Sequence, residues 1–407
     1  MLDCFRKIWG DKRGNALLIA AGALPMIVGA AGLASDTIQW VLWKRQLQRA
    51  ADSAAIAGVY AKIAGQNVDT QVSNDVTKNN QTGIALYSGP TIGYPADGTD
   101  YSNSVSVGLQ VQRSLSFSSF FLSTAPIITA NATAAGVATG KYCVVSLENT
   151  AVTGIMAGGS TTVDLGCGMV TNSTSLNAAI AFGASSVAAS PVAAVGGLST
   201  GQNWAAGTVL LPFTIPEQDP FVAVPAPTIP SPCNGSLSVS PNRTANVSPG
   251  CYTSVNVQGT MNFAPGPYII TGSMSGNASA KLSCTGCSFI FTNSNPASTG
   301  GISFNGGAQF NLSAPTSGPY AGILFYQDRG ASAGTNKLNG NSSSTFQGAV
   351  YFPKQDITFT GASGTTYNCL QLVARTVTFM GNSKITNNCP PNSGAGAFSG
   401  RHVRLVA

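Results

Sequence analysis

Cysteines are the residues whose type and spacing most directly suggest chemistry in this sequence. One of the nine, Cys4, precedes a long apolar stretch, and eight follow it: Cys143, Cys167, Cys233, Cys251, Cys284, Cys287, Cys369 and Cys389. An even number of cysteines beyond such a stretch is typical of disulfides formed in an oxidising compartment. We expect each of the eight to pair with its neighbour in sequence: Cys143 with Cys167, Cys233 with Cys251, Cys284 with Cys287, and Cys369 with Cys389. Spacing alone leaves this connectivity open.

The Cys284-Thr-Gly-Cys287 run could also serve a redox centre or half of a zinc site. A redox motif requires the start of a helix, and a zinc site requires a second pair of Cys or His ligands. Here a strand-like SFIFT follows directly. The context favours a structural disulfide.

Two groupings of residues resemble hydrolase sites in their letters. The run from Gly330 to Gly334 has the G-x-S-x-G pattern of a nucleophile elbow, and Asp356 and His402 follow it in chain order. An elbow must lead into a helix, whereas a turn and a strand pattern follow here. Asp328 and Asp356 could approach each other across neighbouring strands, as the carboxylate pair of a sugar-cleaving enzyme would. We nevertheless predict a non-enzymatic protein without catalytic residues, metal or cofactor.

Composition narrows the class of protein. Only 8% of the 407 residues are charged, against about 25% in ordinary soluble domains, while hydrophobic content is 43%. This balance favours an extracytoplasmic, mainly β protein with a large core. The net charge of +6 is spread thinly, without the basic and aromatic clusters that follow a phosphate backbone, so we predict no nucleic-acid binding.

An apolar stretch near the N-terminus is long enough to cross a membrane. The nineteen residues from Ala16 to Ala34 carry no charge and would form about 28 Å of helix. A cleaved signal normally has a shorter apolar core, and a pilin leader cut at Gly14 would carry Glu where Ile19 stands. Helical spacing continues to Lys62, which favours a retained anchor.

The same region resembles the N-terminal segment of TadG-like proteins of the bacterial tight-adherence (Flp) pilus system. The resemblance lies in RGNALLIAAGALPMIVGAAGLASD, which ends at Gly32 and Asp36, and in the following QLQRAADSAAIAGVYA. It implies a single-pass inner-membrane protein, with its C-terminal bulk in the periplasm or at the cell surface. The implied role is pilus assembly or adhesion, and the implied partners are the inner membrane and other pilus-assembly or envelope proteins.

Beyond Lys141 an apolar alternation repeatedly runs into a glycine and then resumes. The central glycines are Gly259, Gly276, Gly306, Gly340, Gly361 and Gly381. Stacked units of this kind bury a continuous interior that no unit could bury alone. We predict a right-handed parallel β-helix-like solenoid, with a β-sandwich as the alternative. Gly-Asn pairs at 276, 340 and 381 are expected to supply corners with positive φ.

The predicted organisation has four parts. Residues 1–65 form the tail, membrane helix and helical extension, 66–140 a small α+β linker, 141–395 the disulfide-braced solenoid, and 396–407 a tail. A proline-rich segment, 211–233, is expected to run extended over the surface as a strap. A β-helix that binds or degrades polysaccharide at the cell surface is the alternative function, with surface glycans as possible ligands.

Overall fold

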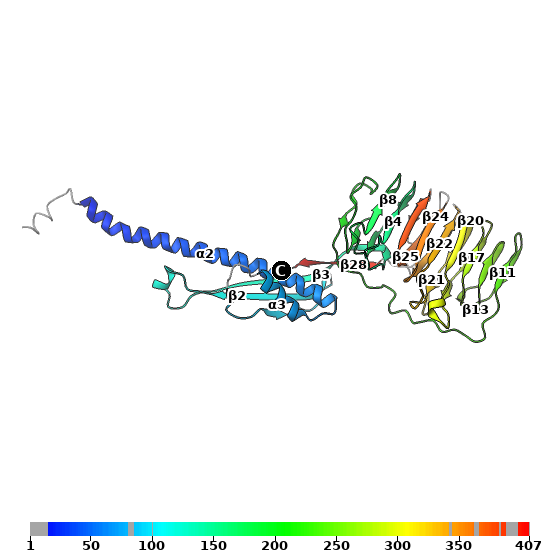
Figure 1. Ribbon diagram of the computed structural model, residues 1–407, viewed down its shortest axis with the longest axis horizontal. Helices are drawn as coiled ribbons and strands as arrows, with labels where there is room; N and C mark the ends of the chain where they lie inside the picture. Colours follow the sequence, from blue (N-terminus) through cyan, green and yellow to red (C-terminus); the bar gives the residue numbers. More distant parts are fainter. Residues whose placement is uncertain are drawn as a thin grey trace, which may run out of the picture. The chain divides into compact units, whose positions relative to one another are not determined.

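The computed structural model is mainly β with one long, apolar N-terminal helix (Figure 1). It describes residues 15–79, 85–99, 101–341, 344–361, 366–381, 384–387 and 398–406. Two compact units make up the chain. The first comprises residues 1–137 and 403–407, and the second comprises residues 138–402.

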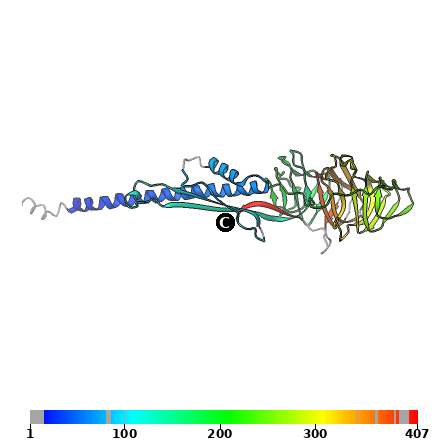
Figure 2. The same ribbon diagram turned by 90° about the horizontal axis from the view of Figure 1, so that it is seen from below.

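The first unit combines two helices with an antiparallel hairpin. Its elements are α2 (Asn15–Ile63), α3 (Val68–Asn79), β1 (Thr91–Gly93), β2 (Tyr101–Gln112), the 3-10 turn η1 (Ser118–Phe120) and the first part of β3 (Ile127–Ser146). β2 pairs antiparallel with both β1 and β3. The β2–β3 hairpin runs beside α2, with its tip toward the N-terminal end of that helix (Figure 2).

Small residues on α2 allow the hairpin to approach closely. Ala51, Ala54 and Ala55 are fully buried against the sheet and α3. A Cβ at Gly58 would lie 2.8 Å from Val105 Cγ1, so that position admits only glycine without repacking. Because the helical extension and the hairpin share this core, the predicted helical extension and the predicted linker belong to one unit.

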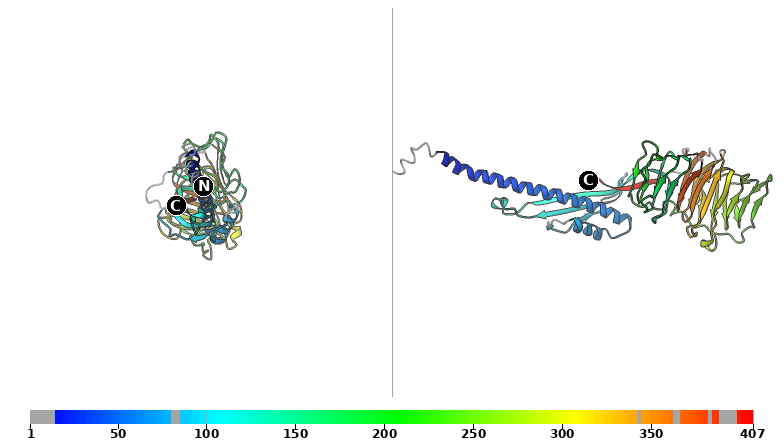
Figure 3. Two further views of the ribbon diagram at one scale, coloured as in Figure 1. Left: turned by 90° about the vertical axis from the view of Figure 1, so that its left-hand side faces the viewer. Right: turned by 45° about the horizontal axis from the view of Figure 1, so that its top comes forward.

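The second unit consists of short strands stacked side by side (Figure 3). The strands pair in parallel along three ladders. The first ladder contains β11 (Leu237–Val239), β14 (Val255–Val257), β17 (Met274–Gly276), β20 (Ile302–Ser313), β22 (Thr335–Gly340), β24 (Asp356–Gly361), β26 (Val377–Gly381), β4 (Ile155–Ala157) and β7 (Ala179–Ala181). The second contains β12 (Thr244–Val247), β15 (Thr260–Phe263), β18 (Lys281–Thr285), β20, β23 (Thr345–Phe352), β25 (Thr366–Ala374), β27 (Lys384–Asn387), β5 (Thr162–Asp164) and β8 (Ser186–Ala188).

The third ladder contains β13 (Gly250–Tyr252), β16 (Gly266–Ile270), β19 (Cys287–Phe291), β21 (Ile323–Gln327), β23, β25, β3, β6 (Gly168–Thr171), β9 (Val192–Ala194) and β10 (Leu210–Leu211). Two further elements are the 3-10 turn η2 (Pro296–Ser298) and β28 (Phe398–Leu405). One apolar cluster extends between the ladders and includes the predicted interior residues Val257, Met274, Phe304, Phe359 and Val377.

The order of strands in the ladders does not follow the order of the chain. β25, β26 and β27 pair with β3, β4 and β5, so the last strands lie beside the first. We call this junction the seam. As a result, β10 and β11 end up at opposite ends of the ladders, and the segment between them must span their length.

The glycine corners differ in part from the expectation. Gly381 has φ +87°, as predicted, but Gly276 and Gly340 do not adopt positive φ. Glycine is required at those two positions for space: a Cβ would lie 2.7 Å from the Phe304 ring at Gly276 and 2.9 Å from Ser344 Oγ at Gly340. Close packing between successive strands is therefore the physical reason for the repeated glycine there.

Candidate functional site

The N-terminal part of α2 presents an apolar surface to its surroundings. The large exposed side chains are Ile19, Leu24, Met26, Ile27, Val28 and Leu33. This helix is long and apolar enough to cross a membrane. Between Ile19 and Trp43 the only charged residue is Asp36, and only 5% of it is exposed. The exposed surface of α2 therefore remains uncharged well beyond Ala34.

Asp36 is buried because it holds the tip of the β2–β3 hairpin. Its Oδ2 atom accepts hydrogen bonds from the backbone N–H groups of Phe117, at 3.1 Å, and Ser118, at 2.5 Å. One turn earlier, Gly32 is buried beneath the Phe117 ring, where any Cβ would overlap the ring carbons. Gly32 and Asp36 are four residues apart and therefore lie on one face of the helix. Together they form the site on which the hairpin tip packs, and we call them the seat residues.

Further along α2, polar side chains hold the shaft of the hairpin. Lys44 Nζ donates a hydrogen bond to the backbone carbonyl of Thr129. Gln48 Nε2 donates to the carbonyl of Asn131 at 2.8 Å and to Asp52 Oδ1 at 2.8 Å. The contacts advance along helix and strand together, so the hairpin is fixed in register from Gly32 to Gln48.

Residues 14–62 match the family model described as "Putative Flp pilus-assembly TadE/G-like". This span is a TadE/G-like domain. No curated protein and no solved structure matches the chain significantly. The matched residues cover α2 except Ile63, and the seat residues Gly32 and Asp36 fall inside the TadE/G-like domain.

The hairpin tip was not singled out from the sequence. Phe120 and Phe121 are 82% and 72% exposed, and Leu122 is 44% exposed. The available signal was the run FSSFFL, from Phe117 to Leu122, in which three aromatic residues lie within five positions. The role of this run depends on its contact with Asp36 of α2, 81 residues before Phe117, and sequence spacing does not predict that contact.

Three of the predicted cysteine pairs lie at disulfide distance. Cα–Cα separations are 5.8 Å for Cys143–Cys167, 4.8 Å for Cys233–Cys251 and 6.1 Å for Cys284–Cys287. The fourth predicted pair, Cys369–Cys389, lies outside the residues whose side chains are described, as does Cys4.

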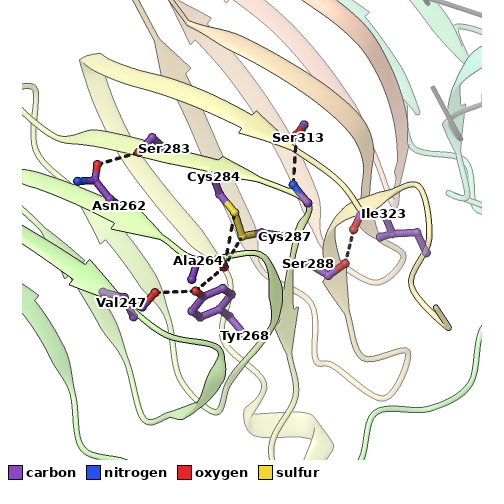
Figure 4. Close-up of a disulfide and its surroundings, with 11 residues drawn as sticks. Val247, Asn262, Ala264, Tyr268, Ser283, Cys284, Cys287, Ser288, Ser313 and Ile323 are labelled. Carbon is purple, nitrogen blue, oxygen red and sulfur yellow. Dashed lines mark hydrogen bonds between the residues drawn. A yellow bond between two sulfur atoms is a disulfide. The ribbon is translucent and has the colours of Figure 1, made fainter. Parts of the chain in front are cut away.

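The C-x-x-C pair closes a corner between two strands (Figure 4). Cys284 belongs to β18 and Cys287 begins β19, with Gly286 at φ +83° between them. Neither cysteine starts a helix, which a redox motif would require. Nearby, the buried Tyr268 hydroxyl lies 2.8 Å and 2.7 Å from the carbonyls of Val247 and Ala264, and burial raises the pKa of Tyr268 to about 12.

The hydrolase-like residues are engaged in structural contacts. Asp328 accepts hydrogen bonds from Thr292 Oγ1 at 2.8 Å and from the Gly330 N–H at 2.9 Å, which caps the loop. Strand β22, not a helix, follows the G-x-S-x-G run. Within the described part of the chain, no three His, Cys, Asp or Glu residues gather as metal ligands.

Asp356 takes part in an ion-pair network at the seam. Arg375 bonds to Asp356 Oδ2 at 2.6 Å and to Glu148 Oε2 at 2.8 Å, which ties β24 to the end of β3. Burial pushes the pKa of Glu148 upward, but hydrogen bonds from Thr150 and the Arg375 charge outweigh it and hold the pKa below its ordinary value. The network thus joins the first and last strands electrostatically.

The proline-rich strap, residues 211–233, contacts the outward side of the third ladder. Phe221 and Val224 pack on an apolar cluster there, and Arg329 donates hydrogen bonds to both of their carbonyls. Tyr351 donates to Asp219 Oδ2 at 2.6 Å, while burial and that carboxylate raise the pKa of Tyr351. A pocket of about 640 Å³ lies farther along, lined by Pro225, Pro227, Pro265, Pro267, Pro315 and Tyr320, among others.

The pKa of Glu217, in the strap, leads us to expect that a substitution there changes the stability of the fold in a pH-dependent way. Burial raises its pKa, although the N–H and charge of Arg401 act in the opposite direction. A raised pKa means that the carboxylate destabilises the folded state at neutral pH, and the penalty disappears as the pH falls through that pKa. We expect Glu217→Gln to be more stable than the native chain at pH 7 and equal to it near pH 4, as measured by urea unfolding.

Glu148→Gln is the matched control, because its lowered pKa gives the opposite sign. The Glu148 carboxylate stabilises the fold above its unfolded pKa of about 4.3, and this contribution is lost on acidification. The Gln variant should therefore be less stable than the native chain at pH 7, and the difference should shrink at low pH. If Glu217→Gln were instead less stable than the native chain at pH 7, as Glu148→Gln is expected to be, the assignment for Glu217 would be wrong.

Proposed function

We propose that this chain is a non-enzymatic, membrane-anchored protein of a bacterial tight-adherence (Flp) pilus system, acting in pilus assembly or surface adhesion. The observation that carries the proposal is the coincidence of the TadE/G-like domain with α2. This match connects the chain to the pilus machinery, and the helix is long and apolar enough to serve as an anchor. Other pilus-assembly or envelope proteins are its proposed partners.

The proposed location is the bacterial inner membrane, crossed once by α2, with the C-terminal bulk in the periplasm or at the cell surface. Three disulfides, all C-terminal to the apolar helix, support this side of the membrane, because disulfides persist in oxidising compartments.

We further propose that the second unit is a right-handed parallel β-helix-like solenoid. Its support is the parallel pairing of all three ladders, because a β-sandwich is built from antiparallel strands. An apolar cluster that continues from strand to strand is what stacked repeats require. A rigid stack of this kind would present an extended surface without needing an active site.

Support for a non-enzymatic role comes from four of the six acidic residues beyond Lys141. Asp328 caps a loop, Asp356 and Glu148 share Arg375, and Asp219 bonds to Tyr351. Carboxylates committed to such contacts are not poised on either side of a glycosidic bond. The polysaccharide alternative is therefore the less favoured one.

Gene deletion with complementation tests the proposal. We expect loss of the gene to abolish or sharply reduce pili and surface attachment, and the native gene to restore both. Complementation by Asp356→Asn should also succeed, because that residue is assigned no catalytic role. Unchanged pili and attachment in the deletion strain would overturn the proposal. Glycan turnover by the purified chain that Asp356→Asn abolishes, while the circular dichroism of the variant stays unchanged, would instead establish the enzyme alternative.

A further inference from the structure

The tip of the β2–β3 hairpin, residues 115–122, has the properties of a second membrane-inserting element. We infer that it enters the lipid bilayer beside α2, and this inference rests on the proposed role of α2 as an anchor. Phe120 and Phe121 are among the most exposed apolar side chains of the described residues. Exposed aromatic residues gathered at one turn usually mark a binding surface rather than a packing defect.

The position of the tip along α2 points to lipid as the partner of its exposed phenylalanines. The tip is seated at Gly32 and Asp36. A hydrocarbon core of about 30 Å covers roughly twenty helical residues, so a span that begins near Ala16 ends close to Asp36. Leu33 of α2, next to the seat residue Gly32, is also exposed, so exposed apolar side chains of both α2 and the tip would lie in the last part of the span.

The backbone of the tip is suited to a medium without water. An N–H group left unpaired in lipid costs several kcal/mol, so inserted turns must satisfy their own donors. Phe117 and Ser118 donate to Asp36, and Ser119 donates to the carbonyl of Leu115. Phe120 donates to the carbonyl of Phe117, and the N–H groups of residues 121 and 122 both donate to that of Ser118. Every backbone donor from 117 to 122 therefore has an acceptor within the protein.

Charge marks the boundary of the inserted region. No charged residue occurs between Arg113 and Lys141, so the tip and its flanks are neutral. Arg113 is exposed at the base of the tip, and Lys44 bonds β3 at Thr129, which pairs with Gln110, three residues before Arg113. Basic residues at the end of an apolar segment interact with lipid head groups. Asp36, which would oppose insertion as a free carboxylate, is covered by the tip itself.

Photo-crosslinking of the full chain in vesicles of phosphatidylethanolamine and phosphatidylglycerol tests this inference. Benzoylphenylalanine is introduced separately at Phe120, Phe121, Met26 and Tyr94, and lipid adducts are detected as a mass increase of one phospholipid. Met26, 77% exposed on α2, reports the anchor, and Tyr94, 54% exposed in the same unit, is the aromatic control away from the tip. We expect lipid adducts at Phe120, Phe121 and Met26, and none at Tyr94.

Each other result has a definite meaning. Adducts at Met26 without adducts at the two tip positions would overturn the inference and leave the anchor intact. Absence of adducts at Met26 as well would overturn the anchor, and with it the basis of the inference. Crosslinks from the tip to a second copy of the chain would show that protein, not lipid, covers the two phenylalanines. Circular dichroism of each substituted chain confirms that the comparison is between folded proteins.

Discussion

Replacing Asp36 with alanine is expected to release the hairpin tip from α2. The substitution removes the single oxygen that accepts the N–H groups of Phe117 and Ser118. A buried donor left without an acceptor costs about 1–3 kcal/mol, so two donors should lower amide protection in the tip by at least about tenfold. Hydrogen exchange of residues 117–122, measured on the full chain in lipid nanodiscs, checks this expectation.

Asp36→Asn is the matched control, because both hydrogen bonds go to the same oxygen and an amide carbonyl can replace it. A neutral acceptor is weaker than a carboxylate, so a small loss of protection is expected. Gly32→Leu should reproduce the alanine phenotype by another route, since its side chain would overlap the Phe117 ring. If the Asn variant lost as much protection as the Ala variant, the charge of Asp36 rather than its acceptor role would be the decisive property.

Local patterns in the sequence were sufficient for features whose causes are local. An uncharged run from Ala16 to Ala34 predicts an apolar helix because length and hydropathy alone decide whether a segment can span a membrane. The three cysteine pairs at disulfide distance have partners 3, 18 and 24 residues apart. The apolar alternation around each repeated glycine similarly predicts strands with one buried face, since side chains alternate between faces.

Features that depend on distant contacts could not be obtained in this way. Pairing of Val377 with Ile155 joins positions more than two hundred residues apart, and no spacing rule predicts that the last strands pair with the first. The family pattern includes Gly32 and Asp36, yet their role becomes visible only when Phe117 is placed above them. Residue type predicts positive φ at Gly276 and Gly340, whereas the neighbouring side chains explain why glycine is needed there.

Phe289→Ala is expected to destabilise the second unit strongly. The ring is fully buried in β19, with ring centroids 5.5 Å from Tyr268 and 5.4 Å from Phe325, its partners on the two neighbouring strands. Removing a buried aromatic ring leaves a cavity and costs about 3–5 kcal/mol. Urea unfolding of the full chain measures the loss, and Phe213→Ala, at a position 68% exposed, is the control that should change stability by less than about 0.5 kcal/mol.

Which strands lose stability in Phe289→Ala is a sharper test than the total loss of unfolding free energy. The pattern depends on how strongly each strand is stabilised by the others. In a stack of repeats each strand is stabilised mainly by its nearest neighbours. Hydrogen exchange should therefore show the greatest loss of protection in β11 to β18. These strands lie on the side of β19, the strand of Phe289, that is away from the seam. Strands β4, β6 and β9, beyond the seam, should keep most of their protection. Equal loss on both sides would mean that the unit unfolds as a single cooperative core, which a stack with only neighbour contacts does not require.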